Sequence, residues 1–396
     1  MIEMVNNPRN HSSSLLSVLL VAALLALTAC GSTSTGENRS STGTSTEAVA
    51  AAAKAVEAGY TGDYTDPPTS GPKPVAGKDI WVITAWQQVR ALAYQAEQLV
   101  AAATTIGWKA RVCDGLNNVN GGMSTCVRQA TAAGADGIVL VSVDCAPVRQ
   151  ALVEARKAGV KIASFSGFDC DDPTQDGGTP LFHAPASYSA SMPTLADFYT
   201  RLGRLRADVA VARTQGRAKV LHVAFHGIAF GEYVAKGFQE GMAACGGCEI
   251  VSTVKIAPAD VPNIRQKFET ALLQVPKANV VAVDVDHFFV AGIQPALVSS
   301  PRKDLLVIGN ECQIDNLDYI REDKGQQFCF GASNAYRAYA TVDALSRVFN
   351  DDPVVPSGIG LQIVDKTRNL PAPGTEYLGP VDFVSLYGKL WDGSSR

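Results

Sequence analysis

The sequence has no excess of basic residues and no run of lysine or arginine. Its 34 Lys and Arg stand against 38 Asp and Glu, which gives a formal net charge of -4 at pH 7. This balance excludes the electrostatic footprint of a nucleic-acid-binding protein and of a polybasic membrane patch. Hydrophobic residues make up 46% of the 396 residues and charged residues 18%. The composition is therefore globular, and the chain is long enough for two domains and appendages.

The sequence also lacks the loops that mark common enzyme classes. It has no G-x-S-x-G elbow, no Walker loop and no G-x-G-x-x-G after a predicted strand. The stretch FHGIAFGEY at 225–233 contains glycines and opens a predicted helix, but it has neither the lysine nor the second glycine spacing of a phosphate loop. We therefore expect no cofactor and no catalytic residue.

Metal-ligand patterns are equally sparse. The five histidines are scattered, and the C-G-G-C motif at 245–248 has no second ligand pair at zinc-finger spacing. Strand alternation places Asp284 and Asp286 on one face with no further acid close in sequence, so we expect no metal there. The carboxylates of Glu232, Asp286 and Glu311 leave a hydrolase open as an alternative. A site that binds hydroxyl groups or a cation needs the same carboxylates.

The N-terminal region is typical of an exported protein. The segment Leu15–Ala29 is apolar but too short to span a bilayer, so it is interpreted as the core of a signal peptide. Its end, LTAC, resembles the bacterial lipoprotein box, in which the cysteine, here Cys30, receives a lipid anchor. We expect residues 1–29 to be removed, and residues 30–76, with an Ala-rich helical stretch at 47–58, to form a flexible tether. The protein would then lie outside the cytoplasm, anchored to the membrane.

The remaining cysteines favour disulfides. They form four consecutive pairs in sequence order: Cys113, Cys126, Cys145, Cys170, Cys245, Cys248, Cys312 and Cys329. An even number in an oxidising compartment is typical of disulfide-bonded proteins. The C-G-G-C motif closes a predicted helix, whereas a thioredoxin-like redox motif opens one, where the helix dipole lowers the thiolate pKa. Disulfides are therefore preferred over catalytic thiols.

Short apolar strands alternate with amphipathic helices from Ile80 onward. Strands are predicted at 80–84, 110–114, 137–143 and 161–166, then at 219–224, 249–255, 280–284, 305–309 and 328–332, with helices near 121–133, 146–158, 232–244, 261–274, 288–298 and 336–349. Continuous apolar strands separated by helices indicate parallel sheets covered on both faces. The segments ADGIVLVSVD and ANVVAVDVD echo one another in the two halves. The sequence thus predicts an α/β fold of two similar Rossmann-like lobes.

Candidate ligand-binding residues lie just past these strands, because ligands of parallel α/β sheets bind beyond the carboxyl ends of the strands. They are Trp86, Gln87, Gln88, Phe165, Ser166 and Phe168 in the first half, and His226, Glu232, Asp286, His287, Glu311 and Asn334 in the second. Asn117, Asn118, Asp144 and Ser333 share this placement. Any one of these residues could instead cap a helix, form a turn or pack in the core. Their joint placement favours a binding site.

Several sequence blocks together resemble one family. They are GKDIWVITAW, GLNNVNGGMSTCVRQATAAGADGIVLVSVD, KIASFSG, GIAFGEYVAKGFQEGM, NVVAVDVDH and LLVIGNE. From about residue 78 the chain is similar to type I periplasmic substrate-binding proteins of the ribose/galactose-binding group, the extracytoplasmic receptors of ABC importers. The resemblance implies lobes of 77–184 plus 333–356 and 185–332 plus 357–396, joined by three crossovers near 183–190, 331–335 and 355–362. Ligand would bind in the cleft between the lobes.

The resemblance also bears on the cysteines and the ligand. It implies the pairs Cys145–Cys170, Cys312–Cys329 and Cys113–Cys126. Sugar-binding members usually carry Asp-Arg where this chain has Phe165 and Ser166, and Arg where it has Glu232. Without those donors, carboxylates and aromatic rings indicate a ligand with an apolar face and donor groups, or a cation over a ring, while a carbohydrate stays open.

The function implied by the resemblance is that of a monomeric, lipid-anchored receptor without enzymatic activity. It would deliver a small-molecule ligand to the permease and ATPase of an ABC importer. A receptor of the same fold that reports ligand to a membrane partner is the open alternative, and a carboxylate-dependent hydrolase is a further one.

Overall fold

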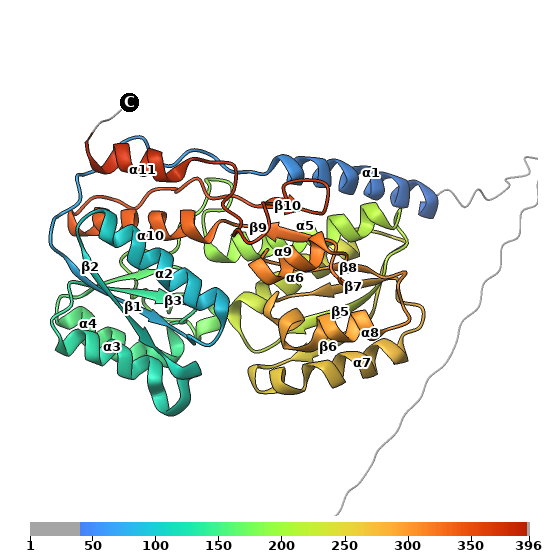
Figure 1. Ribbon diagram of the computed structural model, residues 1–396, viewed down its shortest axis with the longest axis horizontal. Helices are drawn as coiled ribbons and strands as arrows, with labels where there is room; N and C mark the ends of the chain where they lie inside the picture. Colours follow the sequence, from blue (N-terminus) through green and yellow to red (C-terminus); the bar gives the residue numbers. More distant parts are fainter. Residues whose placement is uncertain (1–39, 394–396) are drawn as a thin grey trace, which may run out of the picture. The chain divides into compact units, whose positions relative to one another are not determined.

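Two parallel sheets form the framework of the protein. The computed structural model describes residues 40–393, and the compact unit begins at Ser40. The first sheet contains β1 (Asp79–Thr84), β2 (Lys109–Asp114), β3 (Gly137–Val141) and β4 (Lys161–Ser164), in the order β2-β1-β3-β4. The second contains β5 (Lys219–Phe225), β6 (Glu249–Ile256), β7 (Val280–Val283) and β8 (Leu306–Ile308), in the order β6-β5-β7-β8. The equivalent orders confirm the predicted fold class of two similar α/β lobes (Figure 1).

Helices cover both faces of each sheet. The first lobe uses α2 (Arg90–Thr105), α3 (Gly122–Ala132), α4 (Arg149–Lys157) and α10 (Asn334–Phe349); the second uses α5 (Leu195–Arg213), α6 (Ala229–Ala243), α7 (Ile264–Gln274), α8 (Gln294–Ser299) and α9 (Ile314–Arg321). Val82 lies in one buried cluster with Leu99 of α2 and Leu345 of α10. The next residue of β1, Ile83, lies in another with Val127 of α3. Because neighbouring strand residues point to opposite faces and both faces are covered, the central residues of β1 are apolar on both faces.

Helix α5 is the long helix that the sequence did not predict. Its buried residues cover most of its surface, since it packs against both α1 (Ser40–Thr61) and α6. Only a narrow stripe with Asp197, Arg201, Arg204 and Asp208 is left outside the core, so the apolar part is wider than the single stripe of a surface helix. The start was nevertheless encoded: Asp197 N donates to Thr194 Oγ1 at 3.1 Å, and Thr194 N donates to Asp197 Oδ2 at 3.2 Å. This reciprocal pair is a capping box.

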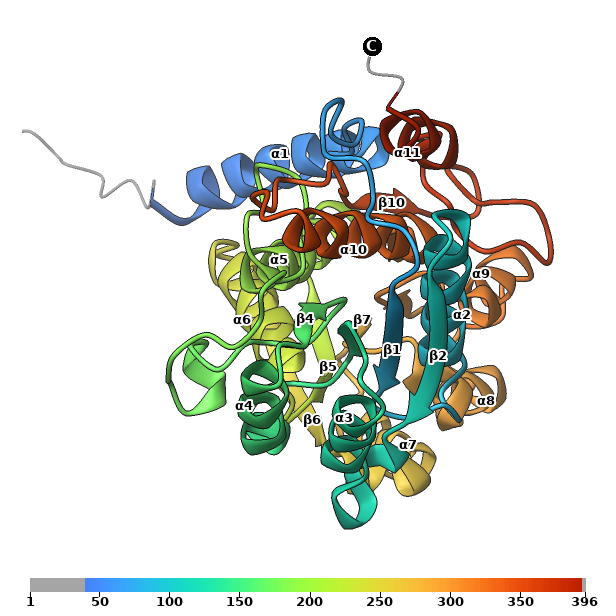
Figure 2. The same ribbon diagram turned by 90° about the vertical axis from the view of Figure 1, so that its left-hand side faces the viewer.

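The lobes are connected by extended segments that pair with one another. The segment around Tyr188 pairs with the segment around Ser357: Ser189 N donates to Ile359 O, and Ser357 N donates to Tyr188 O, both at 2.9 Å. Beside them, β9 (Cys329–Gly331) pairs antiparallel with β10 (Gln362–Val364). We call these paired connecting segments the hinge; the three crossovers near 183–190, 331–335 and 355–362 stay a prediction. The C-terminal helix α11 (Phe383–Trp391) packs on α10 (Figure 2), and the assignment of residues 357–396 to the second lobe stays a prediction.

The N-terminal arm, Ser40–Gly77, is part of the folded unit. Helix α1 packs on α5 and β10, and it buries Ala52, Val56 and Tyr60 in the main core. The chain then runs across the hinge to the first lobe, where Trp108 Nε1 donates to Val75 O at 2.7 Å. From Ser40 onward the segment expected to be a flexible tether is therefore ordered. The Ala-rich stretch is helical as predicted, but its apolar residues have a packing partner. The expected signal peptide and Cys30 lie outside the described residues.

All eight remaining cysteines form disulfides. The pairs are Cys113–Cys126, Cys145–Cys170, Cys245–Cys248 and Cys312–Cys329. Three of them are the pairs that the family resemblance implied, and the fourth closes the C-G-G-C motif.

The loops contain several short helical turns. Three are 3-10 turns, at Ala146–Val148, Pro173–Gln175 and Pro258–Asn263. An irregular turn lies at Leu116–Gly121, and a π-helical turn at Phe289–Ile293 precedes α8.

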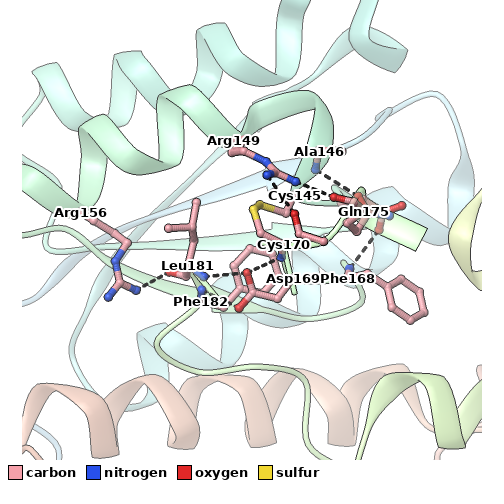
Figure 3. The surroundings of a disulfide bond; sticks show 12 residues. Cys145, Ala146, Arg149, Arg156, Phe168, Asp169, Cys170, Gln175, Leu181 and Phe182 are labelled. Carbon is pink, nitrogen blue, oxygen red and sulfur yellow. Dashed lines mark hydrogen bonds between the residues drawn. A yellow bond between two sulfur atoms is a disulfide. The ribbon is translucent and has the colours of Figure 1, made fainter. Parts of the chain in front are cut away.

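The loop after β4 is held by one of these disulfides and by buried polar contacts. Figure 3 shows Cys145–Cys170 beside the Asp169 carboxylate, which accepts hydrogen bonds from the N–H groups of Leu181 and Phe182 at 2.8 Å each. Cys145, Asp169 and Cys170 bring their ligand atoms together. Because both sulfurs are bonded to each other, this group offers no thiolate to a metal. Between residues 40 and 393, no helix combines the length and the hydropathy needed to cross a bilayer.

Candidate functional site

A cavity of about 190 Å³ lies where the carboxyl ends of the two sheets face each other. Each of the eight parallel strands contributes a residue to its wall from its last position or from just beyond it: Trp86, Asn117, Ser142, Ser166, Phe225, Pro258, Val285 and Glu311. Helices add Val89, Ala91, Leu92, Gln95, Tyr199, Phe230 and Arg337, and the remaining lining residues are Ile228, Val261, His287, Phe288 and Gln313. The cavity thus occupies the place where parallel α/β folds bind ligands.

The first-lobe wall combines one aromatic ring with small polar side chains. Trp86 follows β1, and Ser142 and Ser166 follow β3 and β4. Ser166 Oγ accepts a hydrogen bond from Ser142 N at 3.0 Å and lies 3.2 Å from Ser142 Oγ. Ser142 has a positive φ of 53°, as has Asn117 at 50° in the loop after β2. These tight turns bring the backbone close to the cavity.

The second-lobe wall is an aromatic box. Phe225, the last residue of β5, makes edge-on contacts with Phe230 at 5.5 Å and with Phe288 at 5.1 Å between ring centroids. Phe230 in turn lies 5.3 Å from the Tyr199 ring. Edge-to-face pairs of this kind fix ring orientation in addition to burying area. Together with Trp86 across the cavity, they offer flat apolar surface on two sides.

The hinge end of the cavity is polar and centres on Arg337 of α10. This side chain is 8% exposed. Its Nη2 donates to Phe165 O and to Tyr188 Oη, both at 3.1 Å, and its Nη1 donates to Asn334 Oδ1 at 3.3 Å. A small adjoining hollow of about 30 Å³ shares Ala91, Gln95, Tyr199, Glu311, Gln313 and Arg337 with the main cavity. The polar end therefore lies next to the hinge.

Glu311 has a strongly perturbed carboxyl group. Burial, and secondly the nearby carboxylate of Asp286, raise the pKa of Glu311 to about 7. Its Oε2 accepts hydrogen bonds from Asp286 N at 3.2 Å and from Gln313 Nε2 at 3.4 Å. Burial also lowers the pKa of His287. At neutral pH the cavity thus holds a charged arginine, a neutral histidine and a carboxyl group that is partly protonated.

Four of the residues predicted as ligand-binding line the cavity: Trp86, Ser166, His287 and Glu311. Asn334 lines the adjoining hollow, where its Oδ1 also accepts a hydrogen bond from Gln95 Nε2 at 3.2 Å. Asn117, noted at an equivalent strand end, lines the cavity as well. The strand-end rule thus brought together residues that are distant in sequence.

Three predicted first-lobe residues take structural positions outside the cavity lining, and a fourth is exposed. Phe165 is buried beneath Arg337, with the guanidinium 4.3 Å from its ring centroid. Gln87 caps the end of β2, since its N–H donates to Asp114 Oδ1 at 3.1 Å, and Gln88 is exposed beside it. Phe168 instead lines a wider hollow of about 500 Å³ on the other side of the loop. There it stacks on Tyr233 at 5.2 Å.

Three predicted second-lobe residues also lie away from the lining. Glu232 and His226 pair with each other at 3.0 Å, and Glu232 Oε1 accepts a hydrogen bond from Gly227 N at 3.1 Å. Both side chains are exposed, because the helix start turns them outward to complete the turn. Asp286 is fully buried and accepts hydrogen bonds from Asn310 N and Gln313 N at 2.7 and 3.1 Å. It positions the Glu311 loop instead of facing the cavity.

The most important residues that sequence reasoning missed are Arg337 and Tyr199. The replacements at Phe165 and Glu232 suggested that the site had lost its arginine donors, but α10 supplies one from a different direction. Arg337 is one helical turn beyond Asn334, so the i, i+3 spacing from a predicted site residue was the available signal. Tyr199 lies on α5, which was not predicted at all.

A family model described as periplasmic binding protein domain matches residues 82–352. No curated relative matches the sequence. Among solved structures, an ABC transporter solute-binding protein from Mycobacterium smegmatis with bound glycerol has a TM-score of 0.63 at 18% identity, covering 77% of this chain and 100% of that one. A glucose-galactose binding protein from Geobacillus stearothermophilus gives 0.60 at 13%, with coverages of 74% and 99%. A Caulobacter myo-inositol binding protein bound to myo-inositol gives 0.61 at 15%, with coverages of 75% and 96%.

Proposed function

The chain belongs to the periplasmic binding protein domain family, and from that membership we propose that it is the solute-binding component of an ABC importer. It holds one small ligand in the cavity between its lobes and presents the closed, loaded form to the permease. The family is one of binding proteins rather than enzymes, in agreement with the expectation of no catalytic activity.

The observation that carries the proposal is the composition of the cavity wall. All eight parallel strands of the two sheets contribute to one cavity, and the hinge-side helix α10 contributes Arg337. A ligand that contacts both lobes stabilises the closed arrangement by its differential affinity for it. The volume of about 190 Å³ is below the 300–1,000 Å³ typical of drug-sized ligands. The solute is therefore small.

The relatives agree with a small polar or partly polar solute. Structures similar in fold were solved with glycerol and with myo-inositol, and another is a glucose-galactose binding protein. The four disulfides support a location in an oxidising compartment outside the cytoplasm. A lipid anchor at Cys30 remains part of the proposal on the strength of the sequence alone.

The test combines recovery of the native ligand with transport. The protein is isolated from its own host without denaturation, and the bound small molecule is released and identified by mass spectrometry. We expect one molecule per chain, rebinding of the same compound by calorimetry, and loss of its uptake in a strain that lacks the gene. Conversion of the compound by the protein would instead identify an enzyme. Binding with unchanged uptake would favour a signalling receptor.

A further inference from the structure

The cavity contains a buried positive charge without a carboxylate partner. The described part of the chain buries three arginines, Arg206, Arg337 and Arg347. Arg206 pairs with Asp284 at 2.7 Å and Arg347 with Asp343 at 2.8 Å. Arg337 makes hydrogen bonds only to an amide, a carbonyl and a phenol. A buried charge is costly unless it is paired. Glu311 lines the same end of the cavity and its charge acts on Arg337, but the two make no ion pair, so Arg337 is the buried arginine without a paired carboxylate among the described residues.

Hydrogen-bond donors without acceptors gather at this end of the cavity, beside one buried acceptor without a donor, Gln95 Oε1. Arg337 has five N–H groups, and three of them have acceptors among the described residues. The hydroxyl of Tyr199, which lines the same wall, makes no hydrogen bond to the described residues. The Glu311 carboxyl adds a further donor when it is protonated. A ligand that fits this end must therefore bring acceptors, and a planar carboxylate matches a guanidinium best.

The other end of the cavity excludes a wholly polar ligand. Twelve of the twenty lining residues are apolar or aromatic, among them Trp86, Phe225, Phe230 and Phe288. None of these four lines the small hinge-side hollow, so the apolar surface and the Arg337 end are separated along the cavity. An apolar cavity of about 150 Å³ accommodates one benzene ring. The 190 Å³ here therefore leaves room for a ring and a few further atoms.

We propose that the ligand is a small monocarboxylic acid with an aromatic or cyclic apolar body. Its carboxylate pairs with Arg337 and Tyr199 at the hinge end, and its ring lies between Trp86 and the box formed by Phe225, Phe230 and Phe288. This inference rests on the proposed function and names its solute class. It replaces the earlier expectation of a cation over an aromatic ring, because Arg337 repels a cation in a low-dielectric site.

Ligand series of matched shape test the charge requirement on the wild-type protein. Benzoate, phenylacetate and cyclohexanecarboxylate are compared by calorimetry and thermal shift with benzamide, benzyl alcohol and benzylamine. We expect at least one acid to bind at least tenfold more tightly than its neutral analogue, and no binding of benzylamine. Glucose, glycerol and myo-inositol form a third arm. Equal or tighter binding of the amide or amine overturns the proposal, as does a panel in which no acid binds.

The polyol arm separates failure of this inference from failure of the proposed function. If glucose, glycerol or myo-inositol binds and the acids do not, the ligand class is wrong while a solute-binding function stands. Recovery of the native ligand tests the function without reference to the panel. A result in which neither experiment finds a ligand contradicts both.

Substitutions test whether the preference for an acid over its amide comes from Arg337. Arg337→Gln keeps an amide donor toward Phe165 and Tyr188 but removes the charge, and we expect the affinity ratio of acid to amide to fall to about one. Arg128→Gln removes an exposed arginine that pairs with Glu154 on the first-lobe surface, so the ratio should stay unchanged. An unchanged ratio in folded Arg337→Gln overturns the proposal. Should that variant fail to fold, the comparison of acid and amide on the wild-type protein still decides.

Discussion

The Arg337 guanidinium lies 4.3 Å from the centre of the Phe165 ring and donates a hydrogen bond to the Phe165 carbonyl oxygen at 3.1 Å. Phe165 directly follows β4, and Arg337 lies in the first turn of α10, 172 positions later. A buried cation over an aromatic face gains on the order of 2 kcal/mol from the ring quadrupole. The ring thus holds the guanidinium in place at the end of the cavity, although Phe165 does not line the cavity.

Replacing Phe165 should therefore affect both stability and binding. Phe165→Ala removes a buried ring, at a cost of about 3–5 kcal/mol in the free energy of unfolding, and leaves Arg337 without its support. We expect benzoate affinity to fall at least tenfold, measured by calorimetry below the melting temperature. Phe268→Ala is the matched control, since it removes a fully buried ring of α7 that lines neither the cavity nor the adjoining hollow. A similar loss of benzoate affinity in both variants would contradict the positioning role of Phe165.

The strands could be predicted because their signal is local. The central strands are short apolar runs bounded by turn residues, and β3 reads GIVLV with every residue buried, whereas the edge strand β2 reads KARVCD. Helix α5 is hard to predict from periodicity, because it is buried on most sides and its charged stripe, Asp197, Arg201, Arg204 and Asp208, is narrow. The packing of α1 was also inaccessible, since an Ala-rich helix beside Gly and Ser segments has the same composition whether it packs or not. Contacts with α5 and β10 decide that question.

The site could be predicted only in part, for a geometric reason. Strand ends share one edge of a sheet, so Trp86, Ser166 and Glu311 follow from the fold class. The direction of a side chain beyond the strand depends on the next turn, and Glu232 therefore faces its own helix start. Arg337 reaches the cavity because a crossover places α10 beside the end of β4, which no local pattern of the sequence encodes.

Stability should depend on pH through Glu311. Burial and the nearby Asp286 raise the pKa of Glu311 to about 7, whereas the pKa of a Glu in the unfolded chain is about 4.3. The folded state then binds more protons than the unfolded state between these values, so stability falls as pH rises from about 4.5 through 7. Glu311→Gln removes this loss. We expect the variant to gain melting temperature over the wild type at pH 8 and to show no gain at pH 4, where both states are protonated.

A second buried carboxyl group, that of Asp144, allows the pH dependence predicted for Glu311 to be compared with that of a group of lower pKa. Asp144 accepts a hydrogen bond from Phe168 N at 3.0 Å, and burial, only partly offset by that bond, raises its pKa to about 6. Asp144→Asn should therefore reach its full gain in melting temperature about one pH unit lower than Glu311→Gln. Gains that do not depend on pH, in either variant, would show that packing rather than protonation is responsible.

Two of the disulfides should differ in their contribution to stability. Cys145–Cys170 closes a loop with a sequence separation of 25, and Cys245–Cys248 one with a separation of 3. In the chain-entropy account, the longer loop corresponds to about 3.5 kcal/mol and the shorter to less than about 2 kcal/mol. The double Ser variants are compared by urea unfolding, with the wild type as reference. An equal or larger loss for the Cys245–Cys248 variant would show that entropy of the unfolded chain does not dominate.

The last prediction concerns the N-terminal arm at the hinge. The Tyr64 hydroxyl donates to Gly331 O at 3.1 Å and accepts from Ser333 N at 2.9 Å, at the crossover that leads into α10. Tyr64→Phe removes the acceptor of the Ser333 N–H, so we expect a loss of about 1–3 kcal/mol in the free energy of unfolding. Tyr94→Phe is the control, because the Tyr94 hydroxyl makes no hydrogen bond to the described residues, and it should change stability by less than about 0.5 kcal/mol. If the arm were a free tether, neither substitution would alter the urea midpoint. A loss confined to Tyr64→Phe would instead show that the segment ahead of β1 stabilises the stretch between β9 and α10.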